Sequence, residues 1–190
     1  GSNWTGLELF AEEYKAPLAD ARIDSVAVYF ATTTTVSPDA EITLTINSRN
    51  EDGLPGEELA KTSLKASQLA YDADNVVATI FRFPNSATIK KGQQFFVTIG
   101  PFPNKSIDVS PYADDIAIYA VRRAAGEKCT TFHFMEDQDN QGHSLGTKSW
   151  YKNVDDPLSL TIAPVINYDT AVTGINNVQP SNTIGEKQID

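Results

Sequence analysis

Alternating apolar and polar side chains predict a series of short β-strands along this chain. Residues 42–46 give the clearest pattern, because their aliphatic side chains fall on one face and their threonines on the other. Residues 21–30 alternate in the same way and place Val26, Val28 and Phe30 on one face. Further strands are predicted at residues 7–14, 59–64, 116–121, 130–135, 148–151 and 158–162, with residues 165–166 extending the last one.

The stretch from Val76 to Gly100 is predicted to be the central hairpin of the fold. Its first strand ends in Phe81-Arg82-Phe83-Pro84, Lys90-Lys91-Gly92 forms the turn, and residues 95–99 form the second strand. A second pairing is expected between residues 116–121 and 130–135, because a short turn at residues 124–127 joins them.

Turn signals separate the predicted strands. Residues 32–38 are expected to be a loop, residues 47–56 a turn-rich break with Gly53 and Gly56 in tight turns, and residues 65–69 a single helical turn. Nine or ten short strands without a helix of ordinary length are typical of an all-β antiparallel β-sandwich, and we expect it to be jelly-roll-like. We assign residues 1–168 to this domain and residues 169–190 to a linker or tail.

Composition narrows the classes of partner. The net charge of −10 and pI of about 4.6 disfavour a nucleic-acid backbone or an anionic membrane surface, which leaves cations, neutral sugars and other proteins. The single cysteine excludes an intramolecular disulfide, which suits a bacterial secreted domain, and no apolar run is long enough for a membrane span. Gly1-Ser2 looks like a cloning scar, so any targeting segment would have been removed.

Four segments carry a family resemblance. Residues 52–60, Asp-Gly-Leu-Pro-Gly-Glu-Glu-Leu-Ala, are the most recognisable, and residues 23–30, 81–99 and 149–151 leading into 158–166 are the others. Together they resemble a module of secreted bacterial multidomain proteins that lies beside peptidase, glycan-degrading or adhesin domains and ahead of a C-terminal sorting tail. Residues 173–178 look like the start of the linker that precedes such sorting domains.

The resemblance implies a jelly-roll accessory module without catalytic machinery. Such a module would be secreted or attached to the cell surface, support adhesion or position neighbouring domains, and bind a glycan or a surface protein. The alternative is a glycan-active hydrolase, which needs two carboxylates about 5–10 Å apart. The sequence gives no reason to choose one pair of acidic residues over another, so we predict that the chain is not an enzyme.

Aromatic residues near polar side chains are the candidates for glycan binding. A pyranose stacks its apolar face on an aromatic ring while its hydroxyl groups form hydrogen bonds. Trp150 and Tyr151 are adjacent in a predicted strand and must point to opposite faces, so one of them should face outward. Tyr112 beside two aspartates and Trp4 are further candidates, and each of these aromatic residues has a purely structural interpretation as well.

Residues 136–142 partly match a calcium-binding loop. Asp137, Asp139 and Gln141 supply oxygen atoms at alternating positions, and Gly142 is sixth from Asp137, but Lys148 stands where a bidentate glutamate is required. We expect no cofactor beyond a candidate structural calcium here, and a solvated loop is the alternative. Two further acidic pairs are expected to be loop or turn residues, Asp114-Asp115 and Asp155-Asp156.

Cys129 and His133 raise the question of a nucleophile and its base. Positions four apart on a strand share a face but lie roughly 13 Å apart at about 3.3 Å per residue. That separation is too long for a hydrogen bond or a shared metal ion. We therefore expect Cys129 to be an ordinary buried residue.

Overall fold

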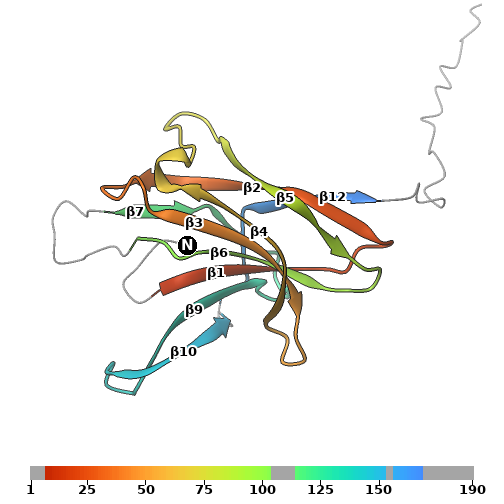
Figure 1. Ribbon diagram of the computed structural model, residues 1–190. Coiled ribbons are helices and arrows are strands. Elements are labelled where there is room, and N and C mark those ends of the chain that lie inside the picture. Colours follow the sequence, from red (N-terminus) through yellow and green to blue (C-terminus); the bar gives the residue numbers. More distant parts are fainter. Residues whose placement is uncertain (1–6, 104–113, 153–155, 169–190) are drawn as a thin grey trace, which may run out of the picture.

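The computed structural model describes residues 7–103, 114–152 and 156–168, and most of its strands lie in two facing β-sheets (Figure 1). The larger sheet has six antiparallel strands in the order β10 (Ser144–Lys152), β9 (Thr131–Gln138), β1 (Leu7–Tyr14), β6 (Phe95–Gly100), β3 (Glu41–Arg49) and β4 (Pro55–Lys65). The smaller sheet has the order β12 (Ile162–Tyr168), β2 (Ala21–Thr34) and β5 (Ala78–Ile89), with β7 (Asp115–Ile118) paired to the end of β2. The predicted all-β antiparallel sandwich is confirmed.

The chain crosses repeatedly between the two sheets. It crosses from β1 to β2, from β2 to β3, from β4 to β5 and from β5 to β6, whereas β3–β4 and β9–β10 are hairpins within the larger sheet. This alternation between layers is the connectivity expected of a jelly-roll-like sandwich. Two short strands, β8 (Ala120–Arg122) and β11 (Leu158–Leu160), form a separate antiparallel pair.

The core lies between the two layers, where the predicted inward-facing residues meet. Val26, Val28 and Phe30 of β2 are buried against the alternate aliphatic residues of β3, as their period of two predicts. Every residue of β6 is buried, because this strand lies between β1 and β3 and both of its faces are covered. The alternating pattern of β3 is therefore typical of a strand with one face in the core. The nearly continuous apolar run of β6 is typical of a strand that is buried on both faces.

The predicted central hairpin is wrong. β5 pairs with β2 in the smaller sheet, and β6 pairs with β1 and β3 in the larger one, so the turn at residues 90–94 bridges the two layers. A strand–turn–strand pattern looks the same in sequence whether the second strand folds back beside the first or crosses to the opposite sheet. Side-chain alternation specifies which face is buried, but it does not specify the partner strand.

The pairing predicted between residues 116–121 and 130–135 is wrong for the same reason. That first segment divides at Tyr119 into β7, which pairs with β2, and β8, which pairs with β11, while β9 pairs with β1 and β10. The last predicted strand also divides, at Thr161, into β11 and β12. The described residues therefore contain twelve strands instead of nine or ten.

Several predicted boundaries also move. β2 continues to Thr34, so only the end of residues 32–38 is loop, and β4 already begins at Pro55. Gly53 lies in the predicted turn with a φ of 76°, but Gly56 lies inside β4, where an added Cβ would be 3.0 Å from the Ser48 hydroxyl oxygen. Gly56 therefore suits a close approach to the neighbouring strand and does not lie in a turn.

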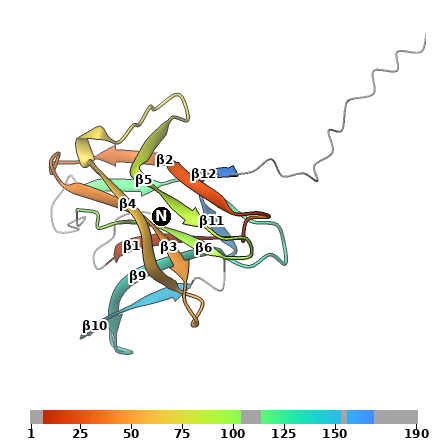
Figure 2. The ribbon, with the colours of Figure 1, turned by 45° about the vertical axis from the view of Figure 1, so that its right-hand side comes forward.

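The β9–β10 hairpin lies at the edge of the larger sheet that is remote from β2 and β12 (Figures 1 and 2). The predicted helical turn is present as a 3-10 helix at Ala66–Gln68. Within the described ranges, no helix has the length and hydropathy that crossing a membrane requires. The predicted tail, residues 169–190, is outside the described residues.

Candidate functional site

Strand β10 places two of the candidate aromatic residues on opposite faces of the larger sheet. In the register with β9, Trp150 lies opposite Phe134 and Tyr151 opposite His133. His133 in turn lies opposite Phe10 of the core, so Tyr151 is on the side of the sheet that faces the second layer. Tyr112, the third candidate, is outside the described residues.

Trp150 packs on the outer face of the larger sheet. Its ring centroid is 5.2 Å from that of Phe134, with an angle of 48° between the planes. It also packs against a small buried cluster of Ala11, Phe96 and Phe132. Trp150 is therefore half-buried and helps to cover this face of the central strands.

Tyr151 is 43% exposed, although it is on the side of the sheet that faces the core, because the smaller sheet does not cover β10. Its hydroxyl group donates a 2.5 Å hydrogen bond to Oδ1 of Asp137 on β9. The hydroxyl groups of Thr147 and Ser149 donate to Oδ2 of the same carboxylate, at 2.6 and 3.0 Å. Residues 147, 149 and 151 share one face of β10, so this strand's period of two creates the arrangement. We call these four residues the Asp137 cluster.

Hydrogen bonding fixes the protonation states within the Asp137 cluster. The hydroxyl groups of Thr147, Tyr151 and Ser149 hold the pKa of Asp137 below its usual value. The hydrogen bond to Asp137, with a smaller effect from the negative charge of that carboxylate, raises the pKa of Tyr151. At neutral pH the carboxylate is therefore ionised and the phenol is protonated, and the ring is held by a charge-assisted hydrogen bond.

Asp139 organises the turn between β9 and β10. Its Oδ1 accepts hydrogen bonds from the backbone N–H groups of Gln141 and His143, at 2.8 and 2.9 Å, and these bonds lower the pKa of Asp139. Asp137 instead faces the hydroxyl groups of β10. Among the described residues, no group of three or more His, Cys, Asp or Glu side chains is placed to share a metal ion. The calcium site formed by Asp137, Asp139 and Gln141 stays a prediction.

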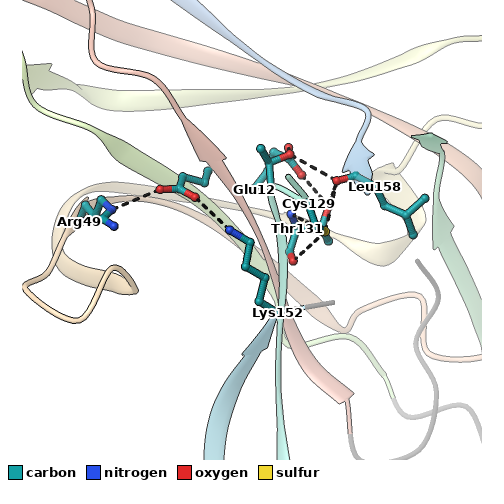
Figure 3. A network of polar contacts seen from close by, with 8 residues as sticks. Glu12, Arg49, Cys129, Thr131, Lys152 and Leu158 are labelled. Atoms are coloured by element: carbon teal, nitrogen blue, oxygen red, sulfur yellow. Dashed lines mark hydrogen bonds and ion pairs between the residues drawn. The ribbon is translucent and has the colours of Figure 1, made fainter. Parts of the chain in front are cut away.

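Glu12 is buried where the larger sheet meets the β8–β11 pair (Figure 3). Its Oε1 accepts hydrogen bonds from the hydroxyl groups of Thr130 and Ser159, and its Oε2 accepts from the Thr131 hydroxyl and from the Leu160 backbone N–H, at 2.9 Å each. One carboxylate thus connects β1, β9 and β11. The donors belong to two segments, residues 130–131 and 159–160, that are distant from Glu12 in the sequence, which makes Glu12 a structural link.

A cleft of about 310 Å³ lies beside this link, at the end of the sandwich. Its charged lining residues are Glu13, Lys15, Arg123, Glu127, Lys128 and Lys152. Glu13 is 3.2 Å from the Arg49 Nε and 3.8 Å from the Lys152 Nζ, and these two basic side chains are labelled in Figure 3. Glu127 accepts a 3.1 Å hydrogen bond from the Arg123 Nη2.

Cys129 and His133 have separate surroundings. The Cys129 thiol is buried and lies 3.4 Å from the Leu158 carbonyl oxygen. The His133 ring packs edge-on against Phe10, with centroids 5.2 Å apart, and burial lowers the pKa of His133. In the described structure no contact joins the two residues, in agreement with the distance expected along a strand.

Of the other acidic pairs, Asp114 and Asp156 lie in loops as predicted, whereas Asp115 is the first residue of β7. Asp114 is buried and accepts hydrogen bonds from the hydroxyl groups of Thr35 and Ser37, at 2.6 and 3.1 Å, which ties the β2–β3 loop to the start of β7. Asp156 forms a 3.0 Å ion pair with Arg122. Asp155 and the candidate Trp4 lie outside the described residues.

Sequence reasoning did not select Thr147, Ser149, Glu12 or Arg123. The alternation of residues 147, 149 and 151 along one strand was a usable signal for the Asp137 cluster. The adjacent Glu12 and Glu13 in a strand were another, because one of two neighbouring residues must face inward. Nothing in the sequence indicates that residues 123–130 approach the end of β1, because that contact depends on strand order.

No protein-family model and no curated protein matches this chain. The assignment of a function therefore relies on the geometry of the site and on the resemblance carried by the four sequence segments.

Proposed function

We propose that the chain is a non-catalytic, secreted or cell-surface accessory module that binds glycan on the Asp137 cluster. Binding there would support adhesion or position a neighbouring domain of a larger protein. The observation that carries this proposal is the exposed ring of Tyr151, which is held in place by its hydrogen bond to Asp137.

The Asp137 cluster offers both kinds of contact that a sugar requires. The Tyr151 ring provides a surface on which a pyranose can stack, and the oxygen atoms of Thr147 and Ser149 lie beside it. A carboxylate has about four acceptor positions, and three donors occupy those of Asp137, so one position is left for a sugar hydroxyl group. Because the ring is already oriented, little side-chain entropy is lost on binding.

Tyr151 differs from the other exposed tyrosines. Tyr71, Tyr119 and Tyr168 are exposed to a similar degree, between 40% and 48%. Among the described residues, the hydroxyl groups of these three have no hydrogen-bond partner, so no such bond orients their rings. Exposure combined with a fixed orientation and adjacent polar oxygens favours Tyr151 as the platform.

The electrostatics support binding over hydrolysis. A glycosidase needs one carboxyl group with a raised pKa to act as a general acid. Hydrogen bonds lower the pKa values of Asp137 and Asp139 instead. Glu13 and Glu127 in the cleft are each engaged in an ion pair with a basic residue. We therefore favour a module without catalysis, as the resemblance to accessory domains of secreted bacterial proteins also implies.

Affinity electrophoresis through gels that contain soluble polysaccharides tests the proposal. Retention of the wild-type chain on at least one neutral polysaccharide is expected. Tyr151→Ala should weaken retention about tenfold because the stacking surface is lost. Tyr151→Phe keeps the ring but loses the bond to Asp137, so an intermediate effect is expected.

Tyr71→Ala is the matched control, because Tyr71 is 48% exposed and lies in a different part of the surface. It should leave retention unchanged. Absence of retention on every polysaccharide would remove glycan binding and leave only the positioning role. Equal losses for Tyr71→Ala and Tyr151→Ala would show that the Asp137 cluster is not the binding site.

A further inference from the structure

We propose that the cleft at the end of the sandwich binds a single oxyanionic group, namely a carboxylate, sulfate or phosphate, with Arg123 as its main ligand. This inference concerns a second site and does not depend on glycan binding at the Asp137 cluster.

The charges of the lining residues leave an excess of positive charge in the cleft. Glu13 is compensated by Arg49 and Lys152, and Glu127 by Arg123. Lys15 and Lys128 also line the cleft, and neither has an ion-pair partner among the described residues. A local cationic site thus exists on a chain whose net charge is −10.

Arg123 also has an unused hydrogen-bond donor. Its Nε is buried, and within the described structure it has no hydrogen-bond partner, although Nη2 donates to Glu127. A buried donor without an acceptor destabilises a fold, so an acceptor that enters the cleft within reach of Nε would relieve that cost. Guanidinium groups bind carboxylate, sulfate and phosphate oxygens with strong charge-assisted hydrogen bonds.

The segment that carries Arg123 and Lys128 is held firmly at both ends. The Arg123 N–H donates a 2.7 Å hydrogen bond to the Pro157 carbonyl oxygen, and the Thr130 N–H donates to the Leu158 carbonyl oxygen at 3.1 Å. Glu127 closes the turn between them by accepting from the Ala124 N–H at 2.9 Å. The basic side chains therefore project from a defined backbone.

The size of the cleft and the charge of the whole chain limit the ligand. A volume of about 310 Å³ is at the lower end of the range for small-molecule sites, so it suits one anionic group. The overall negative charge repels polyanions such as nucleic acid. The ligand is therefore a small anion or the acidic substituent of an otherwise neutral molecule.

Titration of the ¹⁵N-labelled chain, followed by two-dimensional NMR, tests this site. The probes are sodium phosphate, sodium sulfate and sodium glucuronate, with glucose as the uncharged comparison and ionic strength held constant with sodium chloride. We expect saturable shifts of the Arg123 Nε–H and of the Lys128 and Thr130 amides with at least one anion. A response to glucuronate alone identifies a sugar carboxylate, and a response to phosphate or sulfate identifies an inorganic oxyanion.

Matched variants identify the residues responsible. Arg123→Gln and Arg123→Lys should each weaken binding about tenfold, the second because lysine keeps the charge but lacks the Nε–H fork. Lys128→Gln should weaken binding severalfold, and because Lys128 is exposed this variant retains the fold. Arg122→Gln is the control, since Arg122 is on β8 and pairs with Asp156. The proposal is overturned if no anion gives saturable shifts beyond those of chloride, or if Arg122→Gln weakens binding as much as Arg123→Gln.

Discussion

Glu12 is the residue whose replacement tests the assembly of the sandwich most sharply. Glu12 is 2% exposed, and its carboxylate accepts four hydrogen bonds from β11, β9 and the residue before β9. Three of the donors are hydroxyl groups, which can rotate, and the fourth is the backbone N–H of Leu160, which cannot. The two replacements Glu12→Gln and Glu12→Ala should therefore have very different consequences.

Glutamine can place its NH₂ group at the Oε1 end, where both neighbours are hydroxyl groups that can accept as well as donate. Its oxygen then still accepts from the Leu160 N–H. The loss is limited to the extra strength of charge-assisted bonds, partly offset because no charge is buried, so we expect a destabilisation of about 1 kcal/mol.

Alanine removes the acceptor altogether. The Thr130 and Thr131 hydroxyl groups can turn to the Leu158 carbonyl oxygen, which is 3.4 Å from each of them. The Leu160 N–H is left buried and unpaired, which costs about 1–3 kcal/mol, and the loss of the buried Cγ methylene group adds about 0.8 kcal/mol. We therefore expect Glu12→Ala to lower the free energy of unfolding by about 2–4 kcal/mol.

Equilibrium unfolding in urea, followed by tryptophan fluorescence, measures both effects. Glu57→Ala is the control, because Glu57 is an exposed residue of β4, and it should change stability by less than about 0.5 kcal/mol. The reasoning is refuted if Glu12→Ala unfolds within about 1 kcal/mol of wild type, or if Glu12→Gln is as damaging as Glu12→Ala.

Three further predictions follow from the packing and the pKa shifts. In a thermal unfolding assay, Gly100→Ala should destabilise the chain by more than about 2 kcal/mol, because the φ of Gly100 is 135° and the added Cβ would collide with a backbone carbonyl oxygen of β1. Gly92→Ala is the comparison: Gly92 has open space around it, so the variant should cost about 1 kcal/mol in the same assay. Burial lowers the pKa of His133 from 6.5, so the contribution of this residue to stability is complete above pH 6.5 and is lost as the pH falls through the folded-state pKa. Between pH 7.5 and 5.5, the free energy of unfolding should therefore drop less in His133→Gln than in wild type. Tyr151→Phe should raise the pKa of Asp137 toward its usual value, which a ¹³C-detected carboxyl titration measures.

Each of these predictions has a contradicting result. Equal melting temperatures for the two glycine variants would show that the close contact at Gly100 does not destabilise the alanine variant. An unchanged pH dependence in His133→Gln would mean that His133 titrates normally in the folded chain. An unchanged Asp137 pKa in Tyr151→Phe would mean that the Tyr151 hydroxyl group does not act on that carboxylate.

Period-two patterning predicted the strands of this chain well but not their neighbours. Val26, Val28 and Phe30 could be assigned to the core because the burial of alternate residues is a local property. The partner of β5 could not, since the five residues between β5 and β6 allow either a hairpin or a crossing between sheets. Strand order depends on how the layers pack, and alternation carries no information about it.

In the candidate site, too, the local features could be predicted from the sequence and the contacts between strands could not. Tyr151 could be selected because two adjacent aromatic residues of a strand must face opposite ways, and one of them is exposed. Asp137 could be noticed only as an acidic loop residue, because its contact with Tyr151 requires the register of β9 against β10. The cleft at Arg123 depends on four segments that are distant in sequence, so it emerges only from the fold.

Chemical-shift mapping with a panel of neutral oligosaccharides tests glycan binding by the β9–β10 hairpin most directly. We predict that at least one oligosaccharide gives saturable shifts of the Tyr151 ring protons and of the amides around Asp137 and Ser149. If no member of the panel perturbs these resonances, or if the shifts are confined to other strands, the Asp137 cluster does not bind glycan.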